Sequence, residues 1–320
     1  PTAEIFNQPK DVYTKGLLAC RPTPDTTWRR LPLARDFLSH QEHQGPRWKP
    51  AEKDQKAEER TRQEPLFRIE SLCKTFRGKP NIWGQRRIVS ALDEVSLAVY
   101  PGESLGLVGE SGSGKTTLGR MLVGLEPLEQ GQVFFREKPL PSRASALRLL
   151  RKQVQIIFQD PYASLNPRLR IGESISEVLR VQRKMSRRQA RITTQELLEK
   201  VGLLPDYYQR YPHAFSGGQR QRIGIARALA VEPQFIVCDE SVSALDVSVQ
   251  AQILNLLNDL KDEYGLTYLF ISHDLNVVKY FCDRIAVLQE GKLVESGPAE
   301  GLYRSPQKAY TQGLIEAIAG

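Results

Sequence analysis

The amino-acid sequence predicts an α/β fold in which a buried, mainly parallel sheet is combined with a helical insert. Four short apolar runs have the composition of strands, and three of them are almost continuously apolar, as is typical of parallel strands covered on both faces. These runs are residues 105–108, 235–238, 268–271 and 285–288. Between the second and third runs, residues 249–264 place apolar side chains on one stripe, which predicts an amphipathic crossover helix. Residues 160–230 show helical patterns, such as 171–179 and 195–201, but no strand pattern, so we expect the insert there.

The composition indicates a folded protein in which any membrane role is peripheral. The 320 residues are 40% hydrophobic and 26% charged, enough for two average domains or one large α/β domain with appendages. No apolar run approaches the roughly 18–20 residues that a membrane-spanning helix needs. The four cysteines form no Cys-x-x-Cys pair, which favours a reducing, cytosolic setting over a disulfide scaffold or a zinc module.

The formal net charge of +8 raises the question of an anionic partner such as nucleic acid or a membrane surface. Basic residues are interleaved with acidic ones, as in residues 53–60, and long basic blocks are absent from the sequence. This pattern is typical of a solvated surface. We therefore expect no nucleic-acid partner.

Composition divides the chain into four segments. After a short patterned start at residues 1–21, residues 22–63 are rich in Pro, Arg, Glu and Gln and have little apolar periodicity. We expect these residues to be a linker that lies on a surface or stays mobile. Residues 64–296 alternate strand and helix patterns and form the predicted main domain, with the helical insert at about 160–230. Residues 297–320 form a C-terminal extension.

A glycine-rich loop follows the first of the four apolar runs. Its residues fit the pattern G-x-x-x-x-G-K-[ST] and are Gly109, Glu110, Ser111, Gly112, Ser113, Gly114, Lys115 and Thr116. Glycine allows such a loop to wrap a phosphate group with its backbone N–H groups, and the following helix directs its positive end at the same phosphate. Lys115 would reach the β and γ oxygens, and the Thr116 hydroxyl would bind Mg²⁺. The alternative is a glycine-rich turn without a ligand.

Two acidic residues end the second apolar run. Asp239 and Glu240 follow the strand pattern at 235–238. In a phosphate-binding enzyme, Asp239 can hold Mg²⁺ through water, and Glu240 can polarise the water that attacks the γ-phosphate. A solvated strand end would have the same sequence, so the phosphate loop is what favours the catalytic interpretation.

A second phosphate-binding pattern begins at Ser216. Ser216, Gly217, Gly218 and Gln219 open a helical stretch that runs to residue 231. Taken alone, this is an ordinary helix start capped by serine. Its glycines also leave backbone N–H groups uncovered at a helix N-terminus, which suits an anion. Two such elements in one chain suggest that each serves a different nucleotide.

In this order the motifs resemble those of the nucleotide-binding subunits of ABC transporters, and the resemblance covers residues 66–320. It implies a P-loop NTPase (RecA-like) fold with an antiparallel β subdomain and an α-helical subdomain. The signature motif is residues 215–219, with Phe215 where leucine is commoner. Gln159 matches the Q-loop glutamine, residues 243–246 match the D-loop, and His273 matches the switch histidine. Phe76 occupies the position of the aromatic residue that stacks on adenine.

The resemblance also implies the roles of individual residues, with ATP and Mg²⁺ as cofactors. Catalysis is assigned to Glu240, His273 and Gln159, and Mg²⁺ binding to Thr116, Gln159 and Asp239. The nucleotide contacts are assigned to Phe76, Gly109, Glu110, Ser111, Gly112, Ser113, Gly114, Lys115, Thr116, Thr117, Ser216, Gly217, Gly218, Gln219 and Asp246. Taken singly, Gln159 is also typical of a polar loop residue, His273 of a core or surface histidine, and Phe76 of a core aromatic.

The implied partners follow from the same resemblance. Two such domains meet head to tail and enclose two ATP molecules, so that residues 216–218 complete the site of the opposing domain. The partner is a second ATPase domain upstream in the same polypeptide, or a second copy of this chain. Transmembrane permease subunits, with a periplasmic or surface solute-binding protein, would place the chain on the cytoplasmic face of the inner membrane.

Within the family, the sequence is most similar to the dipeptide and oligopeptide import ATPases. Residues 160–167 and 246–252 follow the Q-loop and the D-loop in their style, and residues 298–314 match their C-terminal extension. The lengthened stretch 77–87 is a further similarity. Ser241 departs from the family, which usually has proline there, but no catalytic group is lost. The resemblance leaves open whether the solute is a dipeptide, an oligopeptide, glutathione, a metal chelate or a peptide antibiotic.

Two other functions are weighed against transport. A soluble ABC ATPase acting on nucleic acid or ribosomes would use the positive charge, but it usually carries a coiled-coil, zinc or basic insert, which the sequence lacks. A scaffold that binds ATP without hydrolysing it is the second alternative, and the presence of Glu240 and His273 argues against it.

An internal repeat predicts that residues 1–21 are the tail of a preceding ATPase domain. Nine positions near the start align with nine near the end at a constant offset, and six of the pairs are identical. The first set is Pro1, Ile5, Phe6, Pro9, Tyr13, Thr14, Gly16, Leu17 and Leu18, and the second is Pro298, Leu302, Tyr303, Pro306, Tyr310, Thr311, Gly313, Leu314 and Ile315. We therefore expect the chain to be the C-terminal half of a tandem polypeptide. The alternative is an unrelated amphipathic leader.

Overall fold

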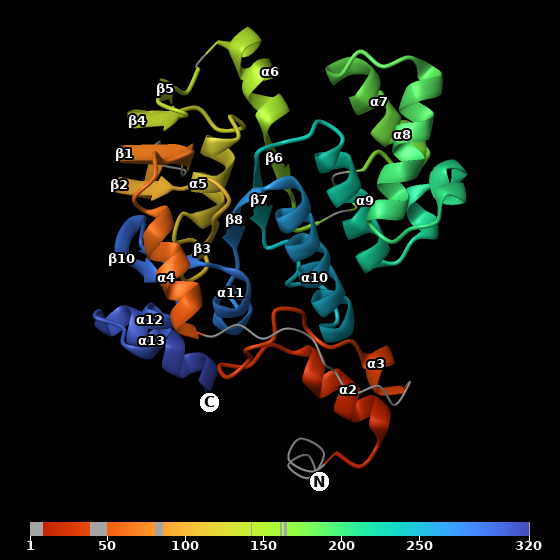
Figure 1. The fold of residues 1–320 in the computed structure, drawn as a ribbon. Helices are drawn as coiled ribbons and strands as arrows, with labels where there is room; N and C mark the ends of the chain where they lie inside the picture. Colours follow the sequence, from red (N-terminus) through yellow and green to blue (C-terminus); the bar gives the residue numbers. More distant parts are fainter. Residues whose placement is uncertain are drawn as a thin grey trace.

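The computed structural model describes residues 9–38, 50–80, 86–141, 143–160, 162 and 165–319. A six-stranded sheet lies at the centre of the domain, with helices against both faces (Figure 1). Its strand order is β10 (Lys292–Pro298), β9 (Arg284–Gln289), β3 (Ser104–Val108), β8 (Thr267–Ile271), β7 (Phe235–Asp239) and β6 (Val154–Ile157). Neighbouring strands are parallel except for the β9–β10 pair. The α/β fold and the four strands expected from the apolar runs are confirmed.

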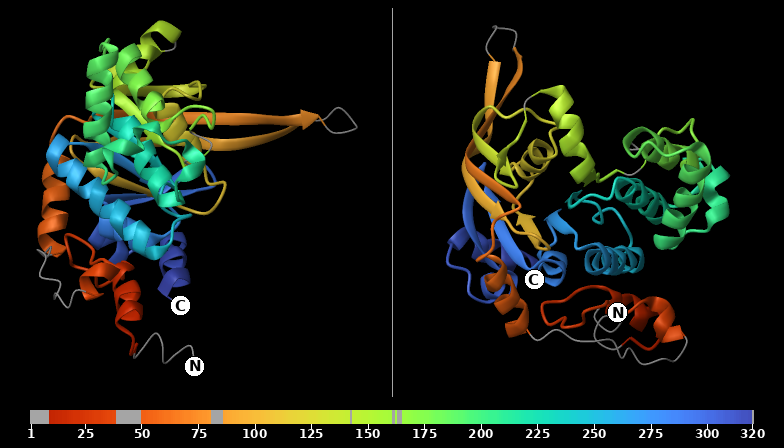
Figure 2. Two further views of the ribbon diagram at one scale, coloured as in Figure 1. Left: turned by 90° about the vertical axis from the view of Figure 1, so that its right-hand side faces the viewer. Right: turned by 45° about the horizontal axis from the view of Figure 1, so that its top comes forward.

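A second, antiparallel sheet packs beside the first. Its order is β2 (Arg86–Val99), β1 (Phe67–Pro80), β4 (Gln130–Phe135) and β5 (Lys138–Pro139). The Phe67 ring contacts the rings of Phe135 and Phe235, with centroids 4.9 and 4.7 Å apart, and so joins the two sheets. Strands β1 and β2 extend past the sheet as a long hairpin (Figure 2), and the described ends of the lengthened stretch, residues 77–80 and 86–87, belong to these two strands. Residues 81–85 lie outside the described residues.

The helical insert forms a lobe beside the six-stranded sheet (Figure 1). It contains α7 (Ile171–Gln182), α8 (Arg187–Lys200), two short 3₁₀ helices (Pro205–Gln209 and Pro212–Ala214) and α9 (Gly217–Leu229). Both α8 and α9 begin with a capping box, in which a serine and a glutamine three residues later satisfy each other's backbone N–H groups. Buried Ile175, Leu198 and Ile223 are in the lobe's core.

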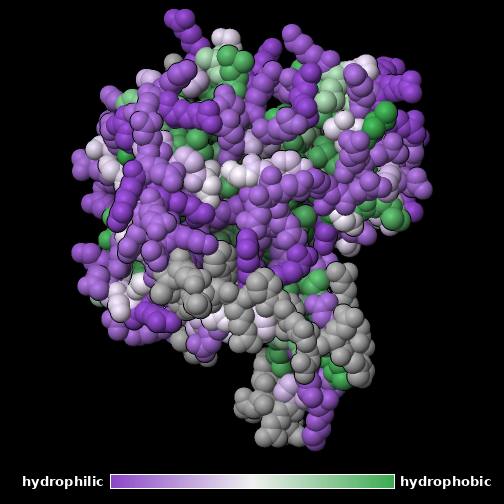
Figure 3. Space-filling view, viewed as in Figure 1, coloured by the Kyte–Doolittle hydropathy of each residue, from purple (hydrophilic) through white to green (hydrophobic). Residues whose placement is uncertain are grey.

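Further helices belong to the main domain and to the C-terminal extension. They are α5 (Lys115–Leu122), α6 (Ala144–Gln153), α10 (Val247–Tyr264), α11 (Leu275–Phe281), α12 (Ala299–Arg304) and α13 (Ala309–Ala319). The expected crossover helix is α10, which starts two residues earlier than its apolar stripe because the Asp246 side chain caps it. Among the described residues, no helix is long and apolar enough to cross a bilayer. The face in Figure 3 is mainly hydrophilic, with small hydrophobic patches.

The first part of the expected linker lies on the surface of α10. After α2 (Val12–Cys20), the chain runs past α10 to α3 (Ala34–Leu38). The Leu31 N–H donates to Asn255 Oδ1, and Asn255 Nδ2 donates to the Leu31 carbonyl, both at 2.8 Å. Cys20, Leu31 and Leu33 are buried in the same core as α10. Residues 21–33, which we call the strap, therefore pack against the domain.

The last part of the expected linker is a helix, α4 (Pro50–Arg60). The half-buried Lys53 Nζ donates to the carbonyls of Lys279 and Tyr280 at 2.6 and 3.0 Å, at the end of α11. Arg60 forms an ion pair of 2.7 Å with Asp283, which also pairs with Lys261 at 2.7 Å. These contacts fasten α4 to the domain on the side of α11 and α12.

Candidate nucleotide-binding site

The glycine-rich loop is tightly enclosed by neighbouring backbone. Gly109 has φ +148° and Gly114 has φ +103°, a region that favours glycine. A Cβ on Gly109 would lie 2.0 Å from the Leu288 carbonyl oxygen, and one on Gly114 would lie 2.2 Å from the Ala91 carbonyl oxygen. Between these two glycines the loop turns back on itself after β3, and α5 begins at Lys115. The N-terminus of α5 therefore opens into the concave side of the loop.

The Lys115 ammonium group is held inside the loop. Its Nζ donates to the carbonyls of Gly109 and Glu110, both at 2.7 Å, and to Ser113 Oγ at 3.3 Å. Burial lowers the pKa of Lys115, and Glu240 and Asp239 partly offset this effect by favouring the charged form. A positive charge is thus placed where a glycine-rich loop would bind phosphate.

Thr116 and Asp239 form a pair of oxygen ligands next to the loop. Thr116 Oγ1 donates to Asp239 Oδ1 at 2.9 Å, which joins the first turn of α5 to the end of β7. Burial raises the pKa of Asp239, and the hydrogen bond from Thr116 opposes this rise. The described residues contain no cluster of three or more His, Cys, Asp or Glu side chains that could hold a metal by themselves. Such a site fits Mg²⁺, which binds through one or two carboxylates together with water and substrate phosphates.

The three predicted catalytic side chains lie together, with two of them next to the carboxylate of the third, Glu240. Gln159 Nε2 donates to Glu240 Oε2 at 3.0 Å, and His273 Nδ1 lies 3.6 Å from the same oxygen. The three residues follow β6, β7 and β8, which are neighbours in the sheet and end at the same edge as β3. Glu240 has φ +47°, a strained conformation for a residue other than glycine and one that is often found at functional sites.

The signature residues lie apart from this cluster. Ser216 caps α9, and its Oγ accepts a hydrogen bond from the Gln219 N–H at 3.3 Å. Ser216 and Gly217 are exposed and Gly218 is buried. In the described part of the chain, no hydrogen bond or ion pair links residues 216–219 to the glycine-rich loop. The structure therefore does not bring the two predicted phosphate-binding elements together within one chain.

Three other predicted contacts have different environments. Phe76 lies in β1 opposite Val89, is 41% exposed, and has the Lys74 ammonium group 5.4 Å from its ring centre. Asp246 caps α10 by accepting a hydrogen bond from the Val249 N–H at 3.0 Å. Thr117 is half-buried in the first turn of α5. Phe76 is thus partly exposed to solvent, while Asp246 caps a helix.

One residue at the loop was not assigned a role from sequence. The Tyr310 hydroxyl, in α13, accepts a hydrogen bond of 3.1 Å from the backbone N–H of Glu110. The two residues are 200 positions apart, so no local pattern joins them. The only sequence signal is that Tyr310 belongs to the repeated Tyr-Thr pair at 13–14 and 310–311.

Comparison with known proteins agrees with this geometry. The family model described as ABC transporter matches residues 92–243, and the model described as oligopeptide/dipeptide transporter, C-terminal region, matches residues 1–46 and 294–319. The oligopeptide transport ATP-binding protein OppF of Bacillus subtilis is 52% identical over 236 residues, which are 73% of this chain and 77% of OppF. The chain belongs to the ABC transporter ATP-binding family.

Two further comparisons concern length and fold. The glutathione import ATP-binding protein GsiA of Escherichia coli K12 is 44% identical over 322 residues, and the match covers 98% of this chain but 50% of GsiA. Among solved structures, an ATP-binding cassette in a dimeric, post-hydrolysis state with ADP and phosphate is similar with a TM-score of 0.65. It is 29% identical, and the match covers 73% of this chain and 99% of that one. Both sheets and the helical lobe are therefore those of an ABC ATPase.

Proposed function

We propose that the chain hydrolyses ATP to drive an ABC importer of peptides or peptide-like solutes. The observation that supports this most directly is the convergence of Gln159 and His273 on one carboxylate oxygen of Glu240, beside a phosphate loop. Relatives named for oligopeptide and glutathione import support the solute class.

The proposed reaction uses the chain's own residues as follows. The backbone N–H groups of the loop and Lys115 bind the phosphates, and Phe76 stacks on adenine. Thr116, Asp239 and Gln159 would hold Mg²⁺ with their side-chain oxygens. When bound, this ion neutralises charge on the β and γ phosphates. Glu240 orients and polarises the attacking water, and Gln159 and His273 position its carboxylate.

We further propose that residues 216–219 act on the nucleotide of a second ATPase domain. Ser216 and Gly217 are exposed at the N-terminus of α9, a 13-residue helix, and among the described residues no hydrogen bond or ion pair joins them to the phosphate loop of their own chain. An exposed helix N-terminus favours an anion because its first N–H groups lack partners within the helix. The dimeric state of the similar cassette supports a pairing of two ATPase domains.

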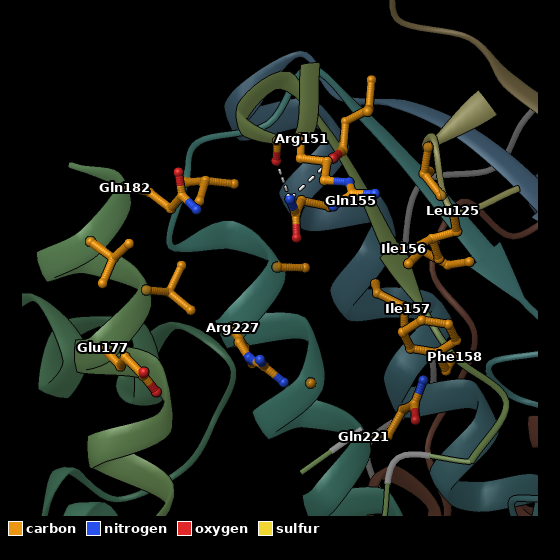
Figure 4. A pocket seen from close by; sticks show the side chains of 17 residues that line it. Leu125, Arg151, Gln155, Ile156, Ile157, Phe158, Glu177, Gln182, Gln221 and Arg227 are labelled. Carbon is orange, nitrogen blue, oxygen red and sulfur yellow. Dashed lines mark hydrogen bonds between the residues drawn. The ribbon is translucent and has the colours of Figure 1, made fainter. Parts of the chain in front are cut away.

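A cleft between the sheet and the helical lobe is the proposed docking surface for the permease. It has a volume of about 450 Å³ and is lined by β6, α7 and α9 (Figure 4). Most of the lining is apolar, and the buried amide of Gln221 has no hydrogen-bond partner there among the described residues. The lining includes Phe158, next to Gln159, so a segment docked in the cleft would sit beside the residue that contacts Glu240. We therefore propose that the chain works at the cytoplasmic face of the inner membrane.

An exposed residue of the cleft provides the test of this proposal. Val181 lines the cleft and is 66% exposed, so Val181→Asp should fold normally. We expect the variant to hydrolyse ATP as wild type does in isolation but to lose sedimentation with permease-containing vesicles and to lose solute uptake. Lys115→Ala is the matched variant that should lose hydrolysis. Retention of the wild-type chain on RNA or DNA, with none on the vesicles, would instead support a soluble nucleic-acid ATPase.

We also propose that residues 1–21 close a preceding ATPase domain and that residues 22–63 connect the two domains. The two separate matches to the C-terminal transporter region, and the match to half the length of GsiA, support this. Reading the coding sequence upstream of Pro1 tests the proposal. A start codon directly before Pro1, with no second phosphate loop in frame, would refute it.

A further inference from the structure

The C-terminal extension reaches the phosphate loop through one side chain. Tyr310 lies in the first turn of α13, half-buried, and its ring packs with Leu314 and Ile315 against the main core. From this position its hydroxyl accepts the Glu110 N–H at 3.1 Å. Burial raises the pKa of Tyr310, so the phenol is neutral at physiological pH.

This contact restrains a residue that the nucleotide-binding lysine also restrains. The Glu110 N–H is held by Tyr310, and the Glu110 carbonyl accepts a hydrogen bond from Lys115 Nζ at 2.7 Å. Elsewhere in the loop, the Gly291 N–H donates to the Ser113 carbonyl at 3.1 Å. Tyr310 is therefore the contact through which the extension restrains the start of the loop, while the β9–β10 turn restrains its middle.

We propose that Tyr310 is a positioning residue of the ATP site, which keeps the first turn of the phosphate loop in its binding conformation. The inference rests on the proposed role of residues 109–116 in binding ATP phosphates. A loop that samples other conformations binds its ligand more weakly, in proportion to the lost population of the competent state. A single neutral hydrogen bond changes such an equilibrium by about 2- to 10-fold.

The internal repeat supports a dedicated role for this tyrosine. Tyr310 and Thr311 correspond to Tyr13 and Thr14, in the two segments that match the same transporter C-terminal region. Tyr13 is 51% exposed in this structure, whereas Tyr310 is half-buried at the loop. The extension that carries the pair contacts the phosphate loop of the domain it closes.

The test compares two tyrosine-to-phenylalanine variants of the full chain. Tyr310→Phe removes only the hydroxyl at the loop. Tyr303→Phe, in α12 of the same extension, removes a hydroxyl whose partner is Asn276 Oδ1 at 3.2 Å, away from the loop. We expect Tyr310→Phe to raise the dissociation constant of ATP by about 2- to 10-fold and to speed hydrogen exchange of the Glu110 amide, with Tyr303→Phe unchanged in both.

The melting temperature of each variant separates positioning from folding. If Tyr310→Phe lowers the melting temperature but leaves ATP affinity and Glu110 exchange as in wild type, the proposal is overturned and Tyr310 is a packing residue. Lys115→Ala is included as a reference. If that variant binds ATP as tightly as wild type, the assignment of the loop itself fails, independently of Tyr310.

Discussion

Replacing Glu240 by glutamine tests the proposed base with little change in shape. The amide keeps a carbonyl oxygen that can accept the 3.0 Å hydrogen bond from Gln159 Nε2, so the contact between the Q-loop and the end of β7 should survive. What disappears is the basic carboxylate oxygen. We therefore expect ATP binding within about twofold of wild type, because no residue of the phosphate loop changes.

The expected loss of rate follows from the chemistry of a positioned base. Removing such a group typically slows a reaction by about 10²- to 10⁴-fold, which corresponds to about 3–5 kcal/mol of transition-state stabilisation. Single-turnover hydrolysis with excess protein measures the chemical step directly. Separate equilibrium binding of ATP shows whether the nucleotide site is intact.

A matched variant controls for the loss of one negative charge. Glu199→Gln makes the same substitution at an exposed position in α8 and should hydrolyse ATP at the wild-type rate. Near-normal turnover in Glu240→Gln would show that another carboxylate activates the water. Loss of ATP binding in this variant would equally contradict the reasoning, because it would give Glu240 a role in holding the nucleotide.

Three further substitutions test other parts of the molecule. Phe76→Ala should weaken ATP binding by up to 100-fold without lowering the melting temperature, since aromatic stacking on a base contributes about 1–3 kcal/mol and the ring is 41% exposed. Asn255→Ala leaves the buried N–H and carbonyl of Leu31 without partners and should cost about 2–4 kcal/mol in urea unfolding. Burial raises the pKa of Asp283, but Lys261 and Arg60 outweigh it and lower the pKa to about 2. Relative to Asp283→Asn, wild type should lose about 2 kcal/mol of stability as the pH falls from 4 to 2, because the stabilising ionised form is protonated over that range.

Each of these predictions has a control and an opposing result. Ile88→Ala, at an exposed position in β2 near Phe76, should leave ATP affinity unchanged. A lower melting temperature with unchanged affinity in Phe76→Ala would identify the ring as core. Asn258→Ala removes a longer hydrogen bond to Tyr280 on the same helix as Asn255 and should cost less. Parallel acid-unfolding curves for wild type and Asp283→Asn would show that the ion pairs of Asp283 contribute no stability.

The buried strands and the phosphate loop could be predicted because their signals are local. A parallel strand covered on both faces is apolar at nearly every position, as in β7 and β8, and the loop's glycines are required by backbone geometry within eight residues. Strand β6 was not predicted. It is a four-residue edge strand, and its half-buried Gln155 interrupts the apolar pattern.

Contacts between distant segments could not be predicted from pattern. The hydrogen bonds of Leu31 depend on Asn255, 224 positions away, and Leu31 lies in a stretch with little apolar periodicity. The same holds for Tyr310. The internal repeat draws attention to this tyrosine, but no pattern in the sequence predicts that its hydroxyl contacts Glu110. The grouping of Gln159, Glu240 and His273 was available only through the resemblance, because their spacing along the chain gives no distance between them.

The anchored strap and α4 shift the start of the cooperative folding unit towards the N-terminus. A truncation at residue 63 would uncover apolar surface on α10 and would strip Asp283 of the Arg60 guanidinium. It would also remove Cys20, which packs near the beginning of α10. Burial raises the pKa of the Cys20 thiol to about 11, and the carboxylate of Asp246 adds to this rise. The strap and α4 are therefore structural parts of the ATPase domain against which they pack.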